Sequence, residues 1–235
     1  MQNTTKTAHT DVIDAMFKAG AHFGYSRARR HASVKPFLYG SKNGVDIIDL
    51  EQTAEMLHEA TQFIHSLGKA GKPIVFVGTK SEIKQIVELA ASELEMPYVT
   101  SRWVGGILTN WPEIKKRTAR LKELSSLFEK GELEKYTKKE RLLFERELET
   151  LKAEFGGIAN LEGAPGALVI IDPREEHIAV TEARKVKVPT VSLLNSDCNK
   201  SEITYPVLAN DAALESVRFF LSKVKEAYQQ GAKEK

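Results

Sequence analysis

The sequence predicts an α/β fold in which helices cover both faces of a parallel β-sheet. Short apolar runs of strand length recur along the chain, and stretches with apolar residues at helical spacing follow them. Apolar runs bounded by Pro or Gly are typical of strands that are covered on both faces. Strands that alternate with helices favour a parallel sheet. The length of 235 residues and the hydrophobic content of 42% are sufficient for a sizeable core.

The first expected element is a short helix that ends at Gly20. Thr10 is a potential N-cap, and glycine is a common helix stop. The residues between them place four apolar side chains on one face, namely Val12, Ile13, Met16 and Phe17. The stretch that follows contains Gly and Pro at short intervals, so it is expected to form loops and short β structure.

The repeating strand–helix pattern begins at residue 45. Capping signals precede three of the helices: Asp49 with Gln52 resembles a capping box, Ser81 opens the next helix, and Asp172 is followed by Pro173. A last helix carries a stripe of apolar residues from 214 to 228. Strands are expected at 45–50, 73–78, 96–100, 167–172 and 188–194.

The segment from 110 to 155 interrupts this pattern, because it contains no strand candidate. It reads as two charged helices with narrow apolar seams, and Thr137 with Glu140 forms a capping box before the second helix. Seams of this width are enough for two helices to bury each other, so we expect a projecting antiparallel coiled-coil hairpin. The alternative is a pair of helices that lie on the domain. The seams are Ile114, Leu121, Leu124 and Phe128 in the first helix and Phe144, Leu148, Leu151 and Phe155 in the second.

Several classes of protein are excluded by composition. A single cysteine, Cys198, allows no intramolecular disulfide and fits a reducing compartment. No stretch has the apolar core of a signal peptide or the length of a membrane span. The expectation is a soluble cytoplasmic protein that needs no membrane.

Motifs for catalysis are weak. Gly78, Thr79 and Lys80 follow a strand, as in an anion-binding turn, but the full phosphate-loop and dinucleotide patterns are missing. No serine lies in a nucleophile elbow. Asp197, Cys198 and Asp211 have no informative metal-ligand spacing. We therefore expect no enzyme activity, no cofactor and no metal.

One long stretch of the chain, residues 18–44, has six Lys or Arg and two His but no Asp or Glu. The chain as a whole is nearly balanced, with 34 Lys and Arg against 32 Asp and Glu. Arginine forks match phosphate oxygens, and aromatic rings can stack on unpaired bases. This stretch is expected to contact an anionic partner, although an exposed loop with a chance charge bias is the alternative.

A second basic segment covers residues 101–120. It combines a Gly-Gly turn and two tryptophans with Arg102 and four cations between 115 and 120. Trp103 fits a core position as well as a surface position. Two segments that combine cations, aromatic rings and glycines are more than a chance charge bias, and rings of this kind can stack on unpaired bases.

Five motifs in matching order give the chain a resemblance to a known family. They are AGAHFG at 19–24, NGVDIIDL at 43–50, FVGTK at 76–80, RWVGGILTN at 102–110 and EHIAVTEARK at 176–185. In this order they resemble the bacterial branch of the ribosomal protein S2 family, from about residue 12 to 221. The resemblance implies a three-layer, flavodoxin-like α/β/α fold with an inserted helical hairpin and no catalytic activity.

The resemblance also implies partners. Members of the family bind small-subunit ribosomal RNA near the junction of head and body on the solvent side. They contact neighbouring small-subunit proteins and help to dock small-subunit protein one. The expected RNA-binding residues are Lys18, His22, Phe23, Tyr25, Arg27, Arg29, Arg30, His31, Lys35, Arg102, Trp103, Thr109, Asn110, Lys115, Lys116 and Arg120.

The expected organisation has four parts. Residues 1–44 form an N-terminal helix and RNA-contact segment, 45–109 and 156–228 the α/β domain, 110–155 the hairpin, and 229–235 a disordered tail. Two departures from the family pattern occur: Tyr25 stands where a His is common, and Asn195 where an Asp is common. The second departure puts in doubt an ion or partner contact at that position.

Three hypotheses about function remain at this point. The first is a structural RNA-binding protein of the small ribosomal subunit. The second is an enzyme or sensor that binds a phosphorylated small molecule near Lys80, as α/β sheets often do at their strand ends. The third is a protein-interaction scaffold that uses the hairpin.

Overall fold

A five-stranded parallel sheet lies at the centre of the computed structural model, which describes residues 2–234. Its order is β5-β4-β6-β7-β8, and every neighbouring pair is parallel. Counted within the sheet this is 2-1-3-4-5, the order of flavodoxin-like doubly wound sheets. The predicted α/β class is confirmed. The strands are β4 (Ile74–Val77), β5 (Tyr98–Val99), β6 (Ala167–Ile171), β7 (Thr190–Leu194) and β8 (Tyr205–Leu208).

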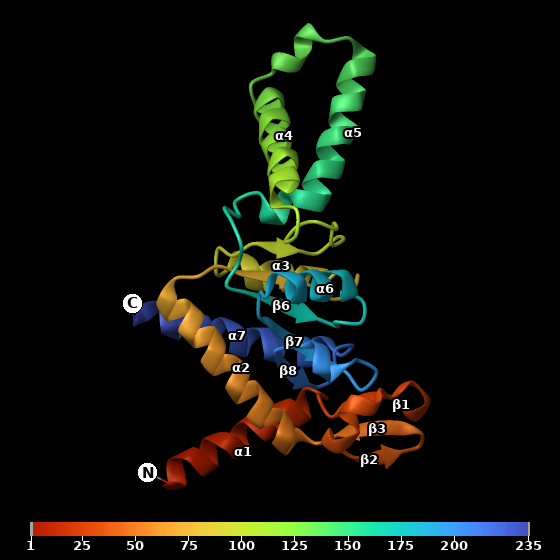
Figure 1. Ribbon diagram of the computed structural model, residues 1–235, viewed down its shortest axis with the longest axis vertical. Coiled ribbons are helices and arrows are strands. Elements are labelled where there is room, and N and C mark those ends of the chain that lie inside the picture. Colours follow the sequence, from red (N-terminus) through yellow and green to blue (C-terminus); the bar gives the residue numbers. More distant parts are fainter. Residues whose placement is uncertain (1, 235) are drawn as a thin grey trace.

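Helices cover both faces of this sheet (Figure 1). Alternate strand residues enter two separate cores, because successive side chains of a strand point to opposite faces. Ile74 and Phe76 pack with α2 (Leu50–Ala70), α3 (Lys84–Ser92) and α7 (Leu214–Lys233). The opposite core, which includes Val75 and Val77, contains α6 (His177–Val186) and residues of α4 (Trp111–Glu129) and α5 (Lys138–Phe155).

The N-terminal part forms a small sheet of its own beside β8. Helix α1 (Gln2–Lys18) leads into β1 (Phe23–Ser26), and β2 (Leu38–Lys42) and β3 (Val45–Ile48) complete an antiparallel sheet of order β1-β3-β2. Short 3₁₀ turns at Arg27–Arg29 and Ala32–Phe37 connect β1 to β2. Thr10 lies inside α1, so the predicted N-cap at this residue is wrong.

Helices α4 and α5 stand away from the sheet, at the end opposite the small sheet (Figure 1). The predicted capping box at Thr137 is confirmed, since its hydroxyl accepts from the Glu140 N–H and its N–H donates to the Glu140 carboxylate at 2.9 Å. Seam residues near the sheet, such as Leu124 and Phe155, are buried. Leu142 and Leu143, nearer the turn, are 47% and 55% exposed.

The C-terminal part differs from the expectation in two ways. The strand β8 is not among the expected strands; it is four residues long and contains Pro206. It is an edge strand, the position in which a sheet tolerates proline. The expected disordered tail from 229 is instead helical, since α7 continues to Lys233.

The end of α7 is held by a close crossing with α2. A Cβ atom on Gly231 would lie 2.1 Å from the His65 carbonyl oxygen, and one on Gly68 would lie 2.3 Å from that of Tyr228. Only glycine allows backbones to approach this closely. Among the described helices, none has an apolar stretch that could cross a lipid bilayer.

Candidate nucleic-acid interface

Both basic segments lie at the carboxyl edge of the central sheet. Arg102 follows β5, and the acid-free stretch of residues 18–44 packs on the residues that follow β7 and β8. Because β5 and β8 are opposite edge strands, the two segments flank this edge from its two ends. This edge is where parallel α/β sheets place their ligands.

Backbone hydrogen bonds attach the acid-free stretch to the sheet. The Ser196 hydroxyl accepts from the Tyr25 N–H at 2.9 Å, and the Ser196 carbonyl accepts from the His31 N–H at 2.8 Å. Asn210 donates to Gly20 and to Ala21 through its side chain and its N–H, at 3.1 and 2.9 Å. Sequence reasoning missed these partners because they are more than 160 residues away from the stretch.

Arg30 has a structural role inside the stretch. Its Nε donates to Asp46 Oδ2 at 2.7 Å, and a second nitrogen donates to Oδ1 of the same carboxylate. The Asp46 side chain is fully buried and also accepts from the Ser41 hydroxyl at 2.8 Å. Hydrogen bonds from Arg30 lower the pKa of Asp46, against the effect of burial. The guanidinium of Arg30 is therefore committed to the fold.

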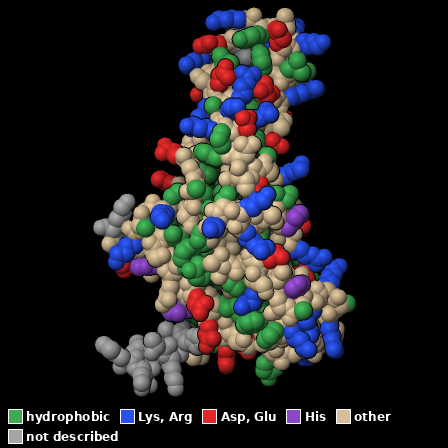
Figure 2. All heavy atoms as spheres, viewed as in Figure 1, with side chains coloured by type: hydrophobic (Ala, Val, Ile, Leu, Met, Phe, Trp, Pro, Cys, Tyr) green, Lys and Arg blue, Asp and Glu red, His purple; other side chains and the backbone are tan. Residues whose placement is uncertain are grey.

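The other cations of the stretch are exposed. Lys18, Arg27, Arg29 and Lys35 have no ion-pair partner among the described residues. Figure 2 shows Lys and Arg side chains gathered over the small sheet, at the lower right of the molecule. Since the first carboxylate after the stretch, Asp46, is buried and paired, this surface presents positive charge without a compensating acid from the small sheet.

Aromatic rings border these cations. Phe23 is 49% exposed, and His22 lies between it and Phe17 with ring centroids 4.1 and 4.5 Å away. The Tyr25 ring lies 5.9 Å from the Arg29 guanidinium. Burial lowers the pKa of His22, which favours the neutral ring. His31 caps the following turn by accepting from the Ser33 N–H at 3.2 Å.

The second basic segment is built on a buried carboxylate. Glu182 of α6 accepts from the N–H groups of Gly106, Leu108 and Thr109 at 2.5, 3.0 and 3.3 Å. Gly106 has φ +105°, a conformation that favours glycine. This carboxylate was missed because nothing local distinguishes it from a surface glutamate. Arg102, Thr109 and Asn110 are exposed on the resulting turn.

Two predicted contacts in this segment have other roles in the structure. Trp103 is 4% exposed and belongs to the core, so of its two expected positions, core and surface, the structure shows the core position. Arg120 pairs with Glu147 of α5 at 2.9 Å and with Glu123 at 3.0 Å, so it joins the two projecting helices. Lys116 forms an exposed pair with Glu113, whereas Lys115 is exposed and has no ion-pair partner among the described residues.

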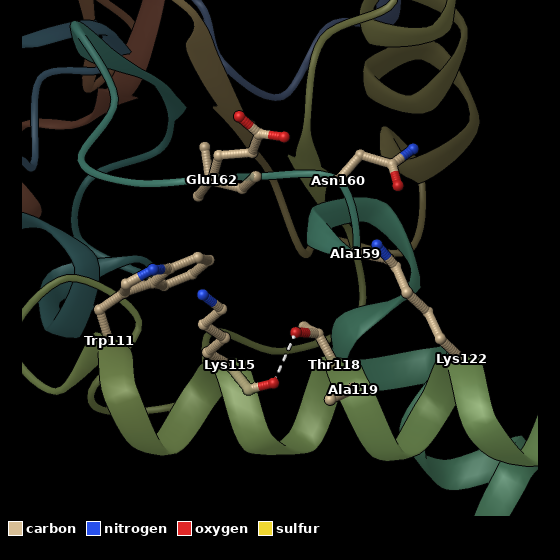
Figure 3. A pocket seen from close by; sticks show the side chains of 9 residues that line it. Trp111, Lys115, Thr118, Ala119, Lys122, Ala159, Asn160 and Glu162 are labelled. Atoms are coloured by element: carbon tan, nitrogen blue, oxygen red, sulfur yellow. Dashed lines mark hydrogen bonds between the residues drawn. The ribbon is translucent and has the colours of Figure 1, made fainter.

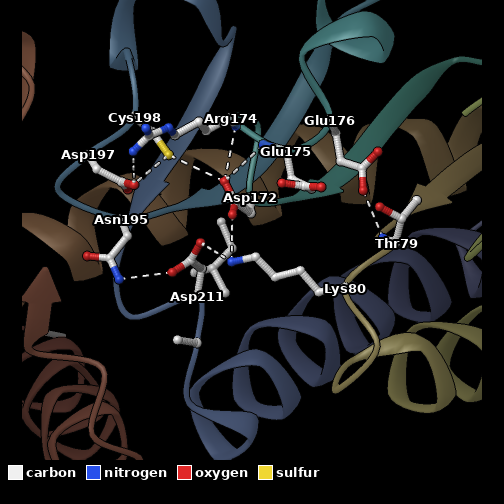
Figure 4. A network of polar contacts seen from close by, with 12 residues as sticks. Thr79, Lys80, Asp172, Arg174, Glu175, Glu176, Asn195, Asp197, Cys198 and Asp211 are labelled. Atoms are coloured by element: carbon white, nitrogen blue, oxygen red, sulfur yellow. Dashed lines mark hydrogen bonds and ion pairs between the residues drawn. The ribbon is translucent and has the colours of Figure 1, made fainter. Parts of the chain in front are cut away.

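The centre of the carboxyl edge is closed by an ion-pair network (Figure 4). Lys80 Nζ lies 2.5 Å from Asp172 Oδ2 and 3.1 Å from Asp211 Oδ2. Burial alone would lower the pKa of Lys80, but the two carboxylates raise it overall. The ammonium group that the sensor hypothesis assigned to a phosphate is thus already neutralised.

The remaining polar residues of this edge are also engaged. The Asn195 side chain donates to Asp211 Oδ1 at 2.9 Å, so this departure from the family pattern places an amide beside a buried carboxylate. Burial and the neighbouring carboxylates raise the pKa of the Cys198 thiol, which keeps it protonated and unreactive. Asp197 pairs with Arg174 at 2.7 Å. Within the described part of the chain, no group of three or more His, Cys, Asp or Glu side chains could hold a metal ion.

Comparisons with known proteins agree with one family. The model of the family described as ribosomal protein S2 matches residues 16–231. The small ribosomal subunit protein uS2 of a Picosynechococcus species is 40% identical over 92% of this chain and 84% of its own length. The proteins of the same name from Koribacter versatilis and Geotalea uraniireducens are 39% and 38% identical over 92% of this chain, and over 72% and 84% of their own lengths.

Proposed function

The chain belongs to the ribosomal protein S2 family, and on this premise we propose that it binds small-subunit ribosomal RNA as a structural constituent of the small subunit. The family consists of non-enzymatic proteins of the cytoplasmic ribosome. What remains to be assigned is the surface that makes the contact. We assign it to the two basic segments at the carboxyl edge of the sheet.

One observation carries this proposal. Apart from Arg30, which pairs with the buried Asp46, the cations of the acid-free stretch are exposed and have no ion-pair partner among the described residues. A cation that serves only solubility needs no such separation from acids. Exposed arginines without a partner are suited to bidentate contacts with phosphate oxygens. Phe23 and Tyr25 add rings that can stack on unpaired bases.

The mechanism is one of positioning. Each cation that contacts a phosphate displaces a condensed counterion, so the affinity is expected to fall steeply with salt. The hydrogen bonds that Ser196 accepts and that Asn210 donates hold the stretch in one conformation before RNA arrives. The interface therefore needs little ordering when it binds.

The finer features of the resemblance extend the proposal. We assign α4 and α5 the role of a coiled-coil arm that reaches a second RNA or protein element, supported by the Arg120–Glu147 pair that joins them. The contact lies near the junction of head and body on the solvent side of the subunit. The nearly balanced net charge of +2 leaves other faces for neighbouring proteins, including small-subunit protein one.

The test compares two triple variants of the full chain. The first is Arg27→Gln with Arg29→Gln and Lys35→Gln. The matched control is Lys72→Gln with Lys187→Gln and Lys233→Gln, which removes the same charge: Lys72 and Lys187 precede β4 and β7 at the amino edge of the sheet, and Lys233 ends α7. Affinity for small-subunit ribosomal RNA transcribed in vitro is measured between 50 and 300 mM salt.

We expect the first triple variant to lose about tenfold or more in affinity and to reduce the slope of log affinity against log salt by about 2 to 3. The control variant is expected to change neither quantity beyond a factor of about two. Equal losses in both variants would mean that only net charge matters and would refute the assigned surface. Circular dichroism of each variant verifies that the fold is retained.

A further inference from the structure

A groove of about 590 Å³ separates the first half of α4 from the loop that follows α5 (Figure 3). Trp111, Lys115 and Lys122 line it from the helix, and Asn160 and Glu162 line it from the loop. The volume lies within the range of about 300–1,000 Å³ that small-molecule clefts occupy. The helix wall of the groove belongs in part to the second basic segment, whereas Lys122 and the loop wall lie outside the surface assigned above.

The cations of α4 differ in their pairing. Lys116 and Arg120, which lie on other faces of the helix, pair with glutamates, whereas Arg117 is exposed and has no ion-pair partner among the described residues. Lys115 and Lys122 are exposed and have no ion-pair partner among the described residues. Figure 3 shows the Glu162 carboxylate on the loop side, directed away from α4. The helix wall of the groove therefore offers two unpaired ammonium groups.

An aromatic ring lies at one end of the same wall. Trp111 is only partly buried, in contrast to Trp103, and its indole lies next to the Lys115 side chain (Figure 3). Between the two lysines the helix presents Thr118 and Ala119. The Thr118 hydroxyl already donates to the Lys115 carbonyl at 3.0 Å. The side chains in this part of the groove are therefore small and have no free hydroxyl donor. A surface of this kind suits a flat ring.

We propose that this groove binds an unpaired nucleotide of an RNA strand. The inference rests on the proposed function, to which it adds a separate subsite. The indole of Trp111 stacks on the base, and stacking of this kind accepts any base. The two ammonium groups contact phosphates. Lys115 and Lys122 are seven residues apart, about 10 Å along the helix axis, so they contact different phosphates of the strand.

An unpaired nucleotide fits better than the other anionic partners. A duplex hides its bases in the stack and cannot present a ring to Trp111. An acidic peptide would pair with the lysines but would offer no flat ring to stack on the partly buried indole of Trp111. RNA supplies both a π-face and phosphates in one chain.

The test uses the tryptophan fluorescence of the full chain. Trp103 is buried and provides a constant background, so a change on binding reports on Trp111. The probes are octaadenylate, an eight-base-pair RNA duplex, adenosine monophosphate and hexaglutamate. We expect saturable quenching by octaadenylate, none by the duplex, and quenching by adenosine monophosphate only at concentrations at least a hundredfold higher.

Variants separate stacking from charge. Trp111→Ala is expected to weaken octaadenylate binding, measured by anisotropy of a labelled strand, by about fivefold or more, and Trp111→Phe to restore it. Lys115→Gln with Lys122→Gln is expected to weaken binding about tenfold. The control Lys72→Gln with Lys187→Gln removes the same charge at the amino edge of the sheet and is expected to stay within twofold. Thermal melting of each variant verifies folding.

The outcomes distinguish this inference from the proposed function. If octaadenylate bound without changing the Trp111 fluorescence and with the same affinity in the lysine variant, RNA binding in the groove would be refuted. That result would not contradict RNA binding by the acid-free stretch. If adenosine monophosphate bound as tightly as octaadenylate, the groove would be a site for free nucleotides. If hexaglutamate competed more strongly than RNA, the groove would be a peptide site. Either result overturns the inference. Failure of the wild-type chain to bind any RNA would overturn the proposed function itself.

Discussion

Arg30 and Asp46 form a two-pronged ion pair inside the small N-terminal sheet, with 2.7 Å between Nε and Oδ2. The carboxylate is fully buried and the arginine side chain is 18% exposed. The pair connects the turn after β1 to strand β3. One arginine of the acid-free stretch thus stabilises the fold that displays its neighbours Arg27 and Arg29.

The first prediction separates these two roles. Arg30→Gln leaves a buried carboxylate without its charged partner, so the free energy of unfolding is expected to fall by about 3 kcal/mol or more. Arg29→Gln removes an exposed cation and is expected to change the free energy of unfolding by less than about 0.5 kcal/mol, while weakening RNA binding. Urea denaturation and RNA titration measure the two quantities. A loss of RNA affinity without a loss of stability in Arg30→Gln would contradict the structural role.

The second prediction concerns pH. Burial and the charge of Asp172 raise the pKa of Asp211 to about 6, although Lys80 and Asn195 act in the opposite direction. The folded state then holds this proton more tightly than the unfolded state, so it binds more protons between about pH 4 and pH 6. The contribution of this group to stability therefore decreases as the pH rises through that window.

The matched variant for this prediction is Asp211→Asn, which cannot titrate. Between pH 4 and pH 7 the free energy of unfolding of the wild type is expected to fall by about 2.4 kcal/mol relative to that of the variant. Urea denaturation at half-unit pH intervals measures it. Parallel stability curves for the two proteins would show that Asp211 titrates at its ordinary value.

The third prediction tests the end of α7. Gly231→Ala introduces a Cβ that would lie 2.1 Å from the His65 carbonyl oxygen, so α2 and α7 must move apart. We expect a loss of about 1–3 kcal/mol, the usual cost of overpacking, despite the better helix propensity of alanine. The control is Gly163→Ala, where a Cβ meets nothing within 4 Å. Equal melting temperatures for the two variants would restore the expectation of a disordered tail.

Local signals in the sequence predicted most of the central fold. The Asp49 carboxylate accepts from the N–H groups of Glu51 and Gln52, as a helix N-cap should, and α2 begins at the next residue. The apolar runs at 73–78, 167–172 and 188–194 contain β4, β6 and β7. Such features depend on neighbours a few residues away. They can be recognised without knowledge of the tertiary structure.

The features that could not be predicted depend on distant partners. Arg30 reads like Arg29 in the sequence, and only the pairing of β1 with β3 brings Asp46 to it. Glu182 resembles a surface residue of an amphipathic helix, yet it accepts three backbone N–H groups from residues more than 70 positions earlier. Residues 205–208 carry no strand prediction, and their place at the edge of the sheet depends on parallel pairing with β7.

The attachment of the acid-free stretch to Ser196 and Asn210 has a consequence for the growing chain. Residues 20–31 leave the site of synthesis early, but the groups that orient them are made some 165 to 190 residues later. Until then Tyr25 and His31 lack their acceptors, and the cations between them have no defined arrangement. The proposed recognition of a folded RNA by this surface would therefore have to wait until the residues up to Asn210 have been translated.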